Sequence, residues 1–381
     1  MRILHILLGG AFNESMSYQG NMLPKYNVED GHEVYIITST YKWEQDQIIN
    51  VGETIYKSRD GIIVYRLKFS GLLVPMLNKK IRRVPKLKKI LESIKPEVIL
   101  HHDIEGHSLL VVAKYIKHNP KTVLYVDTHS DHNNSAQNIL SKYILHRIIY
   151  RYFVKKALPY IKKILYVSYQ CKKFAIENHK INNDSLEFFP LGGTVIDMNE
   201  KQMKKIKLQR TYNIPTESII LTHSGKMDNK KKTLELLTSL SKSPHKNNIF
   251  LILVGKFSRE IYSSAMEIIN NENNILMVGW KSSNELIEII AGSDYYIQPG
   301  SQSATMQISL CQATPVIIEY NESHELYRES GAIYINHIDD LDEIFTYLVE
   351  NYHLSKELSC KAYDFSLKYL DYKVLSKRIL K

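Results

Sequence analysis

The sequence is poor in cysteine, with only Cys171, Cys311 and Cys360 among its 381 residues. The three are far apart, odd in number and without a Cys-x-x-Cys pair, which argues against a disulfide framework and against a cysteine-ligated zinc site. No uncharged apolar run approaches the roughly 18 residues that a membrane-spanning helix needs. The beginning, MRILHILLGG, is typical of a strand entering a glycine turn and not of a signal peptide. We therefore expect a cytoplasmic protein.

Low-complexity segments and short-period repeats are absent as well, and so is the Gly-x-Gly-x-x-Gly fingerprint of dinucleotide-binding proteins. Hydrophobic residues make up 44% of the chain and charged residues 24%, the composition of an ordinary globular protein and not of a disordered or collagen-like chain. A chain of 381 residues exceeds what one hydrophobic core usually serves, so we expect two domains.

The excess positive charge is confined to the first half of the chain. The formal net charge is +10, and residues 1–199, with 28 basic and 18 acidic side chains, carry all of it. The cations gather in residues 79–89 and in residues 143–163, where they alternate with aliphatic and aromatic residues. Such a basic face predicts docking on an anionic membrane surface, with a solvated helix face as the alternative. Nucleic acid is disfavoured as a partner, because no nucleic-acid-binding motif accompanies the charge. The candidates for the membrane-facing or acceptor-side contact in the first stretch are Arg82, Arg83 and Lys86.

Short runs rich in Ile, Val, Leu or Tyr alternate with longer amphipathic stretches, which predicts parallel sheets covered by helices. We predict an α/β fold of two Rossmann-like, doubly wound domains that face a central cleft, with a first domain over 1–193, a linker over 194–215 and a second domain over 216–354. A helical segment over 355–381 could pack on the N-terminal domain. The runs predicted as strands are Ile3–Leu8, Glu33–Thr38, Ile62–Leu67, Val98–His101, Thr122–Val126 and Ile164–Val167, then Ser218–Thr222, Ile249–Val254, Ile275–Val278, Tyr295–Gln298, Pro315–Ile318 and Ala332–Ile335.

Two strand ends of the first half carry candidate ligand-binding residues, because ligands bind at the carboxyl ends of strands in open parallel sheets. Gly9 and Gly10 end the first strand, where glycines let a backbone turn approach a phosphate or a sugar closely; a plain tight turn is the alternative. After the fifth predicted strand, His129 could position a hydroxyl group or carry a proton, and Asp127 and Asp131 could orient it; a surface loop is the alternative. Asp127 and Asp131 are also candidates for the acceptor-side or membrane-facing contact. No converging set of ligands predicts a metal site.

Two strand ends of the second half are suited to an anion. After Ser218–Thr222, Gly225 and the lysines Lys226 and Lys231 precede a helix, so two ammonium groups and the helix amides could surround a diphosphate. A lysine run that merely begins a solvated helix is the alternative. After Tyr295–Gln298, a small and hydroxyl-rich turn feeds another helix, which is a second arrangement suited to an anion.

In the order and spacing of its motifs the sequence resembles a GT-B glycosyltransferase of the large retaining family 4, along nearly the full chain. The motifs are Gly9-Gly10, Gly31-His32-Glu33-Val34, Pro190-Leu191-Gly192, Gly225-Lys226 with Lys231, Val278-Gly279-Trp280, Ala291-Gly292-Ser293-Asp294 and Ala313-Thr314-Pro315-Val316. The resemblance implies that Lys226 and Lys231 bind the donor diphosphate and that His129 lies beside the transferred sugar. It also implies an acceptor-side domain over 1–193, a nucleotide-sugar-binding domain over 216–354, and no metal or other cofactor.

One segment departs from the family pattern. Counted back from Pro315, the family's Glu-x7-Glu pair falls on Gly300 and Ile308, neither of which is acidic, and Ala313 stands in place of the family glycine. The segment instead resembles a branch of surface-polysaccharide enzymes that lacks the glutamate pair and has a Pro-Gly-x-Gln-Ser turn. In that case the resemblance implies that the donor sugar and nucleotide, together with the glycine turns, are held by Ser301, Gln302, Ser303 and Gln307.

The hypothesis is therefore a metal-independent, retaining transfer of a hexosyl or N-acetylhexosaminyl group. The donor would be a nucleotide sugar, UDP-linked, and the acceptor a lipid-linked or cell-surface glycan of the cell envelope. The protein would then work as a peripheral membrane enzyme on the inner face of the membrane. Two alternatives stay open: a nucleotide-sugar 2-epimerase, and a degenerate sugar-nucleotide-binding subunit that serves a partner glycosyltransferase.

Overall fold

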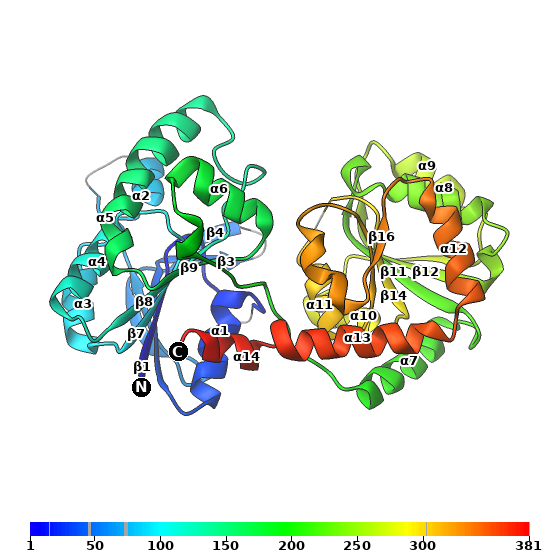
Figure 1. Cartoon of the computed structure of the whole chain (residues 1–381), viewed down its shortest axis with the longest axis horizontal. Coiled ribbons are helices and arrows are strands. Elements are labelled where there is room, and N and C mark those ends of the chain that lie inside the picture. The colour runs from blue at the N-terminus through cyan, green and yellow to red at the C-terminus, as the bar shows by residue number, and fades with distance from the viewer. Residues whose placement is uncertain (15, 45–46, 72–74, 302, 381) are drawn as a thin grey trace. The chain divides into compact units, whose positions relative to one another are not determined.

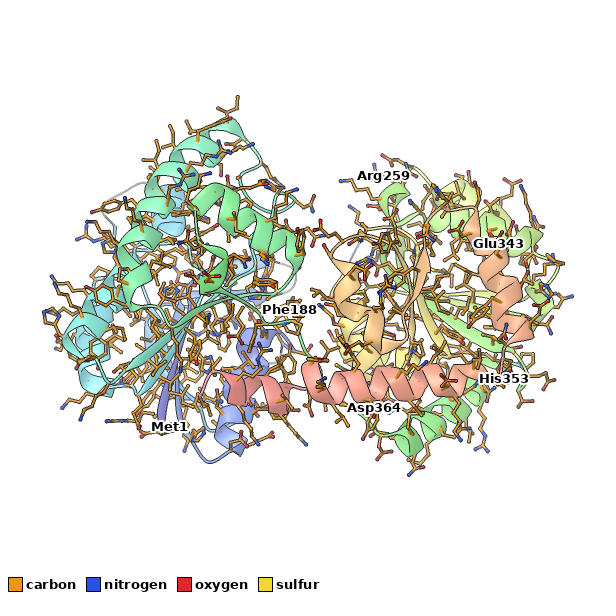
Figure 2. The ribbon with its side chains drawn as sticks, viewed as in Figure 1. Met1, Phe188, Arg259, Glu343, His353 and Asp364 are labelled. Carbon is orange, nitrogen blue, oxygen red and sulfur yellow. The ribbon has the colours of Figure 1, made fainter. Side chains whose placement is uncertain are left out.

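The computed structural model describes residues 1–14, 16–44, 47–71, 75–301 and 303–380, and these form two units (Figure 1). Unit 1 comprises Met1–Pro190 and Leu375–Lys381, and unit 2 comprises Leu191–Val374. Each unit has its own sheet and its own hydrophobic core, with side chains filling the space between sheet and helices (Figure 2). The prediction of two doubly wound α/β domains is confirmed.

An eight-stranded sheet forms the centre of unit 1. The strands of the unit are β1 (Arg2–Leu7), β2 (Glu33–Ser39), β3 (Tyr41–Glu44), β4 (Gln47–Asn50), β5 (Thr54–Lys57), β6 (Ile63–Leu67), β7 (Val98–His102), β8 (Val123–Thr128), β9 (Lys163–Tyr166) and β10 (Leu186–Phe188). The sheet order is β10-β9-β8-β7-β1-β2-β6-β5, parallel except for the pair β5–β6, while β3 and β4 form a separate antiparallel ribbon. The helices are α1 (Gln19–Glu29), α2 (Pro75–Ile81), α3 (Leu87–Ile94), α4 (Ser108–His118), a π-helix (Ser141–Tyr150), α5 (Arg151–Ala157) and α6 (Tyr169–His179).

Unit 2 has a six-stranded, all-parallel sheet. Its strands are β11 (Ile219–Met227), β12 (Ile249–Phe257), β13 (Ile275–Gly279), β14 (Tyr295–Gln298), β15 (Val316–Glu319) and β16 (Ile333–Ile335), in the order β13-β12-β11-β14-β15-β16. Its helices are α7 (Met198–Tyr212), α8 (Thr233–Lys242), α9 (Tyr262–Asn270), α10 (Ser283–Ala291), α11 (Thr305–Cys311), α12 (Asp340–Glu350) and α13 (Leu354–Tyr369), and α14 (Tyr372–Arg378) follows.

Alternate side chains of each strand enter cores on opposite faces of the sheet, because successive side chains of a strand point to opposite sides. In β2, Tyr35 and Ile37 join the core that includes α3 and α4, while Val34 and Ile36 join a smaller core with Phe12. In β11 and β12 the same alternation divides the side chains between α8 and α12 on one face and α7 and α10 on the other. Burial on both faces explains why these strands read as continuous apolar runs.

The boundary between the units differs from the predicted linker. Residues 194–215 include α7, whose Leu208 packs in a core of unit 2, so most of this polar stretch is a helix of the second unit. The chain passes from one unit to the other at Pro190 instead. The predicted C-terminal segment also divides: α13 belongs to unit 2, whereas the residues from Leu375 onward belong to unit 1, where Asn27 Nδ2 donates to the Ser376 carbonyl at 3.2 Å.

Candidate functional site

The strand order of unit 2 reverses between β11 and β14. Counted along the chain, the unit's strands lie side by side as third, second, first, fourth, fifth and sixth. Parallel sheets of this kind bind ligands beyond the carboxyl ends of their strands, at the point where the order reverses. Gly225 and Lys226 lie at the carboxyl end of β11, and Ser301 and Ser303 lie in the turn after β14. The two turns predicted to hold an anion therefore flank one switch point.

Two glycines allow close backbone contacts here, Gly255 between the ends of β12 and β11, and Gly300 between the two turns. A Cβ atom at Gly255, near the end of β12, would lie 1.8 Å from the carbonyl oxygen of Gly225, and one at Gly300 would lie 2.2 Å from the carbonyl oxygen of Lys230. Only glycine fits such close approaches without a backbone shift. The Ser301 amide donates to the same Lys230 oxygen at 2.8 Å. The lysine turn after β11 and the serine turn after β14 thus form one continuous backbone surface.

Lys231 brings a buried ammonium group to this surface. It ends a 3-10 turn, Asn229–Lys231, whose N-cap Asp228 accepts a hydrogen bond from the Lys231 amide at 3.1 Å. The side chain lies over Gly225, where an added Cβ would be 3.1 Å from Lys231 Cε. Its Nζ atom is buried and has no hydrogen-bond partner among the described residues, and burial lowers the pKa of Lys231. A bound anion would neutralise this otherwise unpaired charge.

Lys226 differs from Lys231 because its side chain is exposed. It lies in register with Lys256 on β12, which is exposed as well, so two lysines stand side by side at the ends of adjacent strands. Lys256 was not predicted as a site residue. The sequence does contain a signal for it, since both strands carry Gly-Lys just before their last residue, at Gly225-Lys226 and Gly255-Lys256.

The residues predicted to hold the donor sugar have different environments. Ser303 Oγ donates to Gln298 Oε1 at 2.9 Å, and the Gln298 amide in turn donates to the Ser301 carbonyl, so these three residues shape the turn. Gln307 is buried in α11 and donates to the hydroxyl of Tyr327, which directs its amide into the core. The buried side of α11 packs against segments distant in the chain, which the sequence pattern did not show, and the donor-binding role of Gln307 stays a prediction. Gln302 lies outside the described residues.

The sheet of unit 1 has its own switch point, between β1 and β7. Gly9 and Gly10 follow β1 there and are exposed. A Cβ at Gly9 would lie 3.4 Å from a carboxylate oxygen of Asp103, which follows β7. The glycine turn and the end of β7 are therefore neighbours, at the place where a doubly wound sheet accepts a ligand.

A chain of polar side chains leads from α1 to His129. Asn27 Oδ1 lies 3.0 Å from His5 Nε2, and His5 Nδ1 lies 3.1 Å from His102 Nε2. His102 Nδ1 lies 2.6 Å from Asp127 Oδ2, and the same carboxylate oxygen lies 3.5 Å from His129 Nε2. The members come from α1 and the adjacent strands β1, β7 and β8. His129, whose side chain is 43% exposed, is the end that reaches the surface.

The charges along this chain are well defined. Burial opposes ionisation of Asp127, but His102 and His129 hold the pKa of this carboxyl well below its usual range. Although burial disfavours the imidazolium, the Asp127 carboxylate raises the pKa of His129. Burial lowers the pKa of His5 to about 3, so the inner end is neutral. Asp127 is thus an ionised, fully buried residue that orients His129, so the prediction that it faces a membrane is wrong, and the acceptor-side alternative stays a prediction.

Arg82 is also not at the surface. Its buried guanidinium lies 2.5 Å from the Asp103 carboxylate, so the prediction that it faces a membrane is wrong, and the acceptor-side alternative stays a prediction. The basic run around it suggested an exposed helix face, but the ion pair turns this one side chain inward. Asp131 accepts hydrogen bonds from two backbone amides of its own loop, at 2.8 and 2.9 Å, and so shapes that loop. Arg83 and Lys86 are exposed, and Lys86 lies 2.7 Å from Glu53.

An exposed apolar surface runs along the π-helix and the start of α5. We call it the 139–152 surface, and its members are Ile139, Leu140, Tyr143, Ile144, Ile148 and Tyr152. Ile139 is 79% exposed and Ile148 63%. Lys155 and Lys156 follow it and are exposed as well. Of the helices that the structure describes, none combines the length and the apolar character needed to cross a membrane.

Two groups of described side chains in unit 1 have potential metal ligands that all lie within 4.8 Å of one another. The first is His102, Asp127 and His129, whose atoms already take part in the chain that orients His129. The second is Glu105, His146 and His179. No local motif marks this second group in the sequence, because its members come from three distant segments. Glu105, His146 and His129 also line a cavity of about 390 Å³.

Two family models match the chain in succession. Residues 25–192 match Glycosyltransferase Family 4, and residues 204–363 match Glycosyl transferases group 1. The chain is a family 4-like GT-B glycosyltransferase. The first match lies in unit 1 except for its last two residues, and the second lies within unit 2, which agrees with the resemblance inferred from the ordered motifs.

Solved structures share the fold of this glycosyltransferase over its whole length. A glycosyltransferase from Rickettsia africae ESF-5 has 17% sequence identity and a TM-score of 0.67, over 100% of this chain and 98% of that chain. HepE from Anabaena, in complex with UDP and glucose, has 13% identity and a TM-score of 0.61 with the same coverage. An E. coli trehalose-6-phosphate protein bound with UDP-2-fluoro glucose has 11% identity and a TM-score of 0.64, again over 100% and 98%. No curated protein matches the sequence.

Proposed function

We propose that this glycosyltransferase moves a hexosyl or N-acetylhexosaminyl group from a UDP-linked donor to a lipid-linked or cell-surface glycan. The observation that carries the proposal is the buried ammonium of Lys231 at the β11–β14 switch point, which has no hydrogen-bond partner in the described part of the chain. UDP is supported by two proteins of the same fold, HepE and the E. coli protein, which were solved with UDP or a UDP sugar. The acceptor class is supported by WaaG, a glycosyltransferase involved in lipopolysaccharide biosynthesis that has the same fold at 11% identity, a TM-score of 0.60, and 100% and 99% coverage.

In this proposal Lys231 and Lys226 bind the donor diphosphate and stabilise the negative charge that develops on it as its bond to the sugar breaks. The Lys231 ammonium is already buried and desolvated by folding. The site therefore does not have to rearrange around it when negative charge develops on the leaving diphosphate. Two lysines supply positive charge at the diphosphate, so we infer that the transfer needs no metal there. Retention of the anomeric configuration is inferred from the resemblance to a retaining family.

His129 is proposed to act on the transferred sugar. Its imidazole is oriented by the ionised Asp127 at 3.5 Å and is exposed to a ligand at the surface of unit 1. The carboxylate raises the pKa of His129, which favours a ring that donates hydrogen bonds to sugar hydroxyls. The role is one of binding and positioning.

The donor site can be tested by thermal melting in a panel of nucleoside diphosphates. A ligand that binds the folded state raises its stability by mass action. We expect one nucleotide, UDP, to raise the melting temperature of the wild type and of Lys230→Ala, a matched control with an exposed side chain. Lys231→Ala should lose the shift. Equal UDP-induced shifts in melting temperature in both variants would show that Lys231 is not part of the donor site.

Activity distinguishes the proposal from its two rivals. Incubation with UDP sugars and a lipid-linked acceptor should release UDP and yield a glycosylated acceptor. A UDP sugar returned with one inverted centre would identify an epimerase instead. Nucleotide binding without release of UDP, with every acceptor and donor tried, would identify a degenerate subunit that serves a partner enzyme.

We further propose that the 139–152 surface contacts the anionic membrane that carries the acceptor. Exposed aliphatic and aromatic side chains beside lysines fit the interface between headgroups and acyl chains. Co-sedimentation with phosphatidylglycerol vesicles tests this contact. Ile148→Glu should lower the bound fraction severalfold, whereas Met203→Glu, at an exposed apolar residue of unit 2, should not. An equal loss in both variants would contradict the assignment.

A further inference from the structure

Three distant segments of unit 1 bring one carboxylate and two imidazoles together in the interior. Glu105 lies in the connection between β7 and α4, His146 in the middle of the π-helix, and His179 at the end of α6. Their side chains are 6%, 4% and 0% exposed. None of them belongs to the donor site or to the chain that orients His129.

The facing atoms are spaced as ligands of one metal ion. Glu105 Oε1 lies 3.2 Å from His146 Nδ1 and 3.8 Å from His179 Nε2. Two ligand atoms of a tetrahedral zinc site, with bonds of about 2.1 Å, lie about 3.4 Å apart. The observed distances bracket that value.

The same atoms are not satisfied by one another. Glu105 Oε1, His146 Nδ1 and His179 Nε2 are buried and make ion-pair contacts, but none has a hydrogen-bond partner among the described residues. Unpartnered buried polar atoms are rare and costly, and three that converge on one point need a common ligand. A cation at that point would satisfy all three.

The surroundings hold the two imidazoles in place. The His146 ring contacts Phe174 and Tyr150 edge to face, with centroids 5.3 and 5.1 Å apart. The His179 ring contacts Phe174 in the same manner at 5.8 Å. The π-helix that carries His146 is a rare element, and π-helical turns are frequently found at functional sites. An apolar wall behind preset ligands is typical of metal sites.

We propose that Glu105, His146 and His179 bind one Zn²⁺ ion. One carboxylate oxygen and two imidazole nitrogens form a ligand set that suits zinc, and Glu105 and His146 also line the 390 Å³ cavity, which leaves room for water in a fourth position. The ion ties the β7–α4 connection, the π-helix and α6 to one another. It thereby fixes the helix that carries much of the 139–152 surface. This inference does not rest on the proposed donor or acceptor.

The test uses the full chain without an affinity tag. The protein is stripped with a chelator, dialysed, and titrated with Zn²⁺ while metal content is measured by elemental mass spectrometry. We expect about one Zn²⁺ per chain and a higher melting temperature with zinc, since a metal that binds the folded state stabilises it. Titration with Co²⁺ should give the intense visible absorption of a four- or five-coordinate site.

Variants locate the ion. His179→Ala and the isosteric Glu105→Gln should each weaken Zn²⁺ binding at least about tenfold. His132→Ala, which removes an exposed histidine that pairs with Glu177 at 2.9 Å, should retain it. Wild-type protein without stoichiometric zinc and without the Co²⁺ absorption would overturn the proposal, and this result does not depend on how any variant folds. So would an unchanged affinity in Glu105→Gln, or an equal loss in His132→Ala.

Discussion

Replacing Lys231 by methionine should stabilise the protein while abolishing nucleotide binding. Methionine keeps most of the apolar stem, which packs over Gly225, and removes an ammonium that is buried and has no hydrogen-bond partner among the described residues. Leaving a buried polar group unsatisfied costs about 1–3 kcal/mol, and more for a charged one. We therefore expect the free energy of unfolding of unit 2 to rise by about 1–3 kcal/mol in Lys231→Met.

The assay is thermal unfolding of the wild type and Lys231→Met with and without UDP. For a domain of 150–250 residues, 1 kcal/mol corresponds to about 2–4 °C, so the variant should melt at least about 2 °C higher in the absence of ligand. Saturating UDP should raise the melting temperature of the wild type only, so that with UDP the wild type melts at a higher temperature than Lys231→Met. A variant less stable than the wild type without ligand, or equally stabilised by UDP, would refute the reasoning.

The pH dependence of the stability difference between the wild type and Lys231→Met gives an independent check that the buried ammonium is destabilising. Burial lowers the pKa of Lys231 in the folded state, whereas the unfolded chain titrates near pH 10.4. Between the two values the unfolded state binds more protons, so the stability of the wild type rises with pH. Methionine does not titrate. The difference in the free energy of unfolding between the wild type and Lys231→Met should therefore become smaller as the pH increases toward 10.

Three further outcomes follow from the contacts. Gly300→Ala places a Cβ 2.2 Å from a backbone oxygen, so UDP binding measured by calorimetry should fall at least about tenfold, and unchanged affinity would contradict the shared backbone surface. Arg82→Ala leaves Asp103 without its partner and should lower the free energy of unfolding by about 3 kcal/mol in urea titrations, and an unchanged free energy would contradict a stabilising ion pair. Asp127→Asn removes the carboxylate that raises the pKa of His129, so an NMR titration should show that this pKa falls. In the wild type, the Asp127–His129 pair contributes its full stabilisation below about pH 6.5, and this contribution decreases as the pH rises through the raised pKa of His129. An unchanged titration would exclude the contact.

Much of the fold could be predicted because buried parallel strands appear in the sequence as short, continuous apolar runs. All twelve predicted strands coincide with strands of the structure, and the missed ones, β3, β4, β5 and β10, are short edge or ribbon strands whose side chains are mostly not buried. The polar stretch 194–215 was misread as a linker since α7 is largely exposed, and its few buried contacts, such as that of Leu208, are made with distant segments.

The candidate donor site was predictable to the same extent. Gly225, Lys226 and Lys231 lie close in sequence, and their place at a strand end is a local property. Gln307 could not be judged in this way, because its burial depends on Tyr327, which approaches from another part of the chain.

The sequence by itself determined the class of fold, the positions of most strands, and the lysine and serine turns, because each depends on residues that are neighbours along the chain. Tertiary structure alone decided which charged side chains are buried in ion pairs inside the protein. Arg82 and Asp127 look like surface groups in the sequence, but strands and loops distant in the chain bury them against Asp103 and His102. It also decided that the Lys231 ammonium has no hydrogen-bond partner among the residues that the structure describes, and that Glu105, His146 and His179 converge. These properties depend on desolvation and on distances between remote segments, and neither is encoded in any short stretch of sequence.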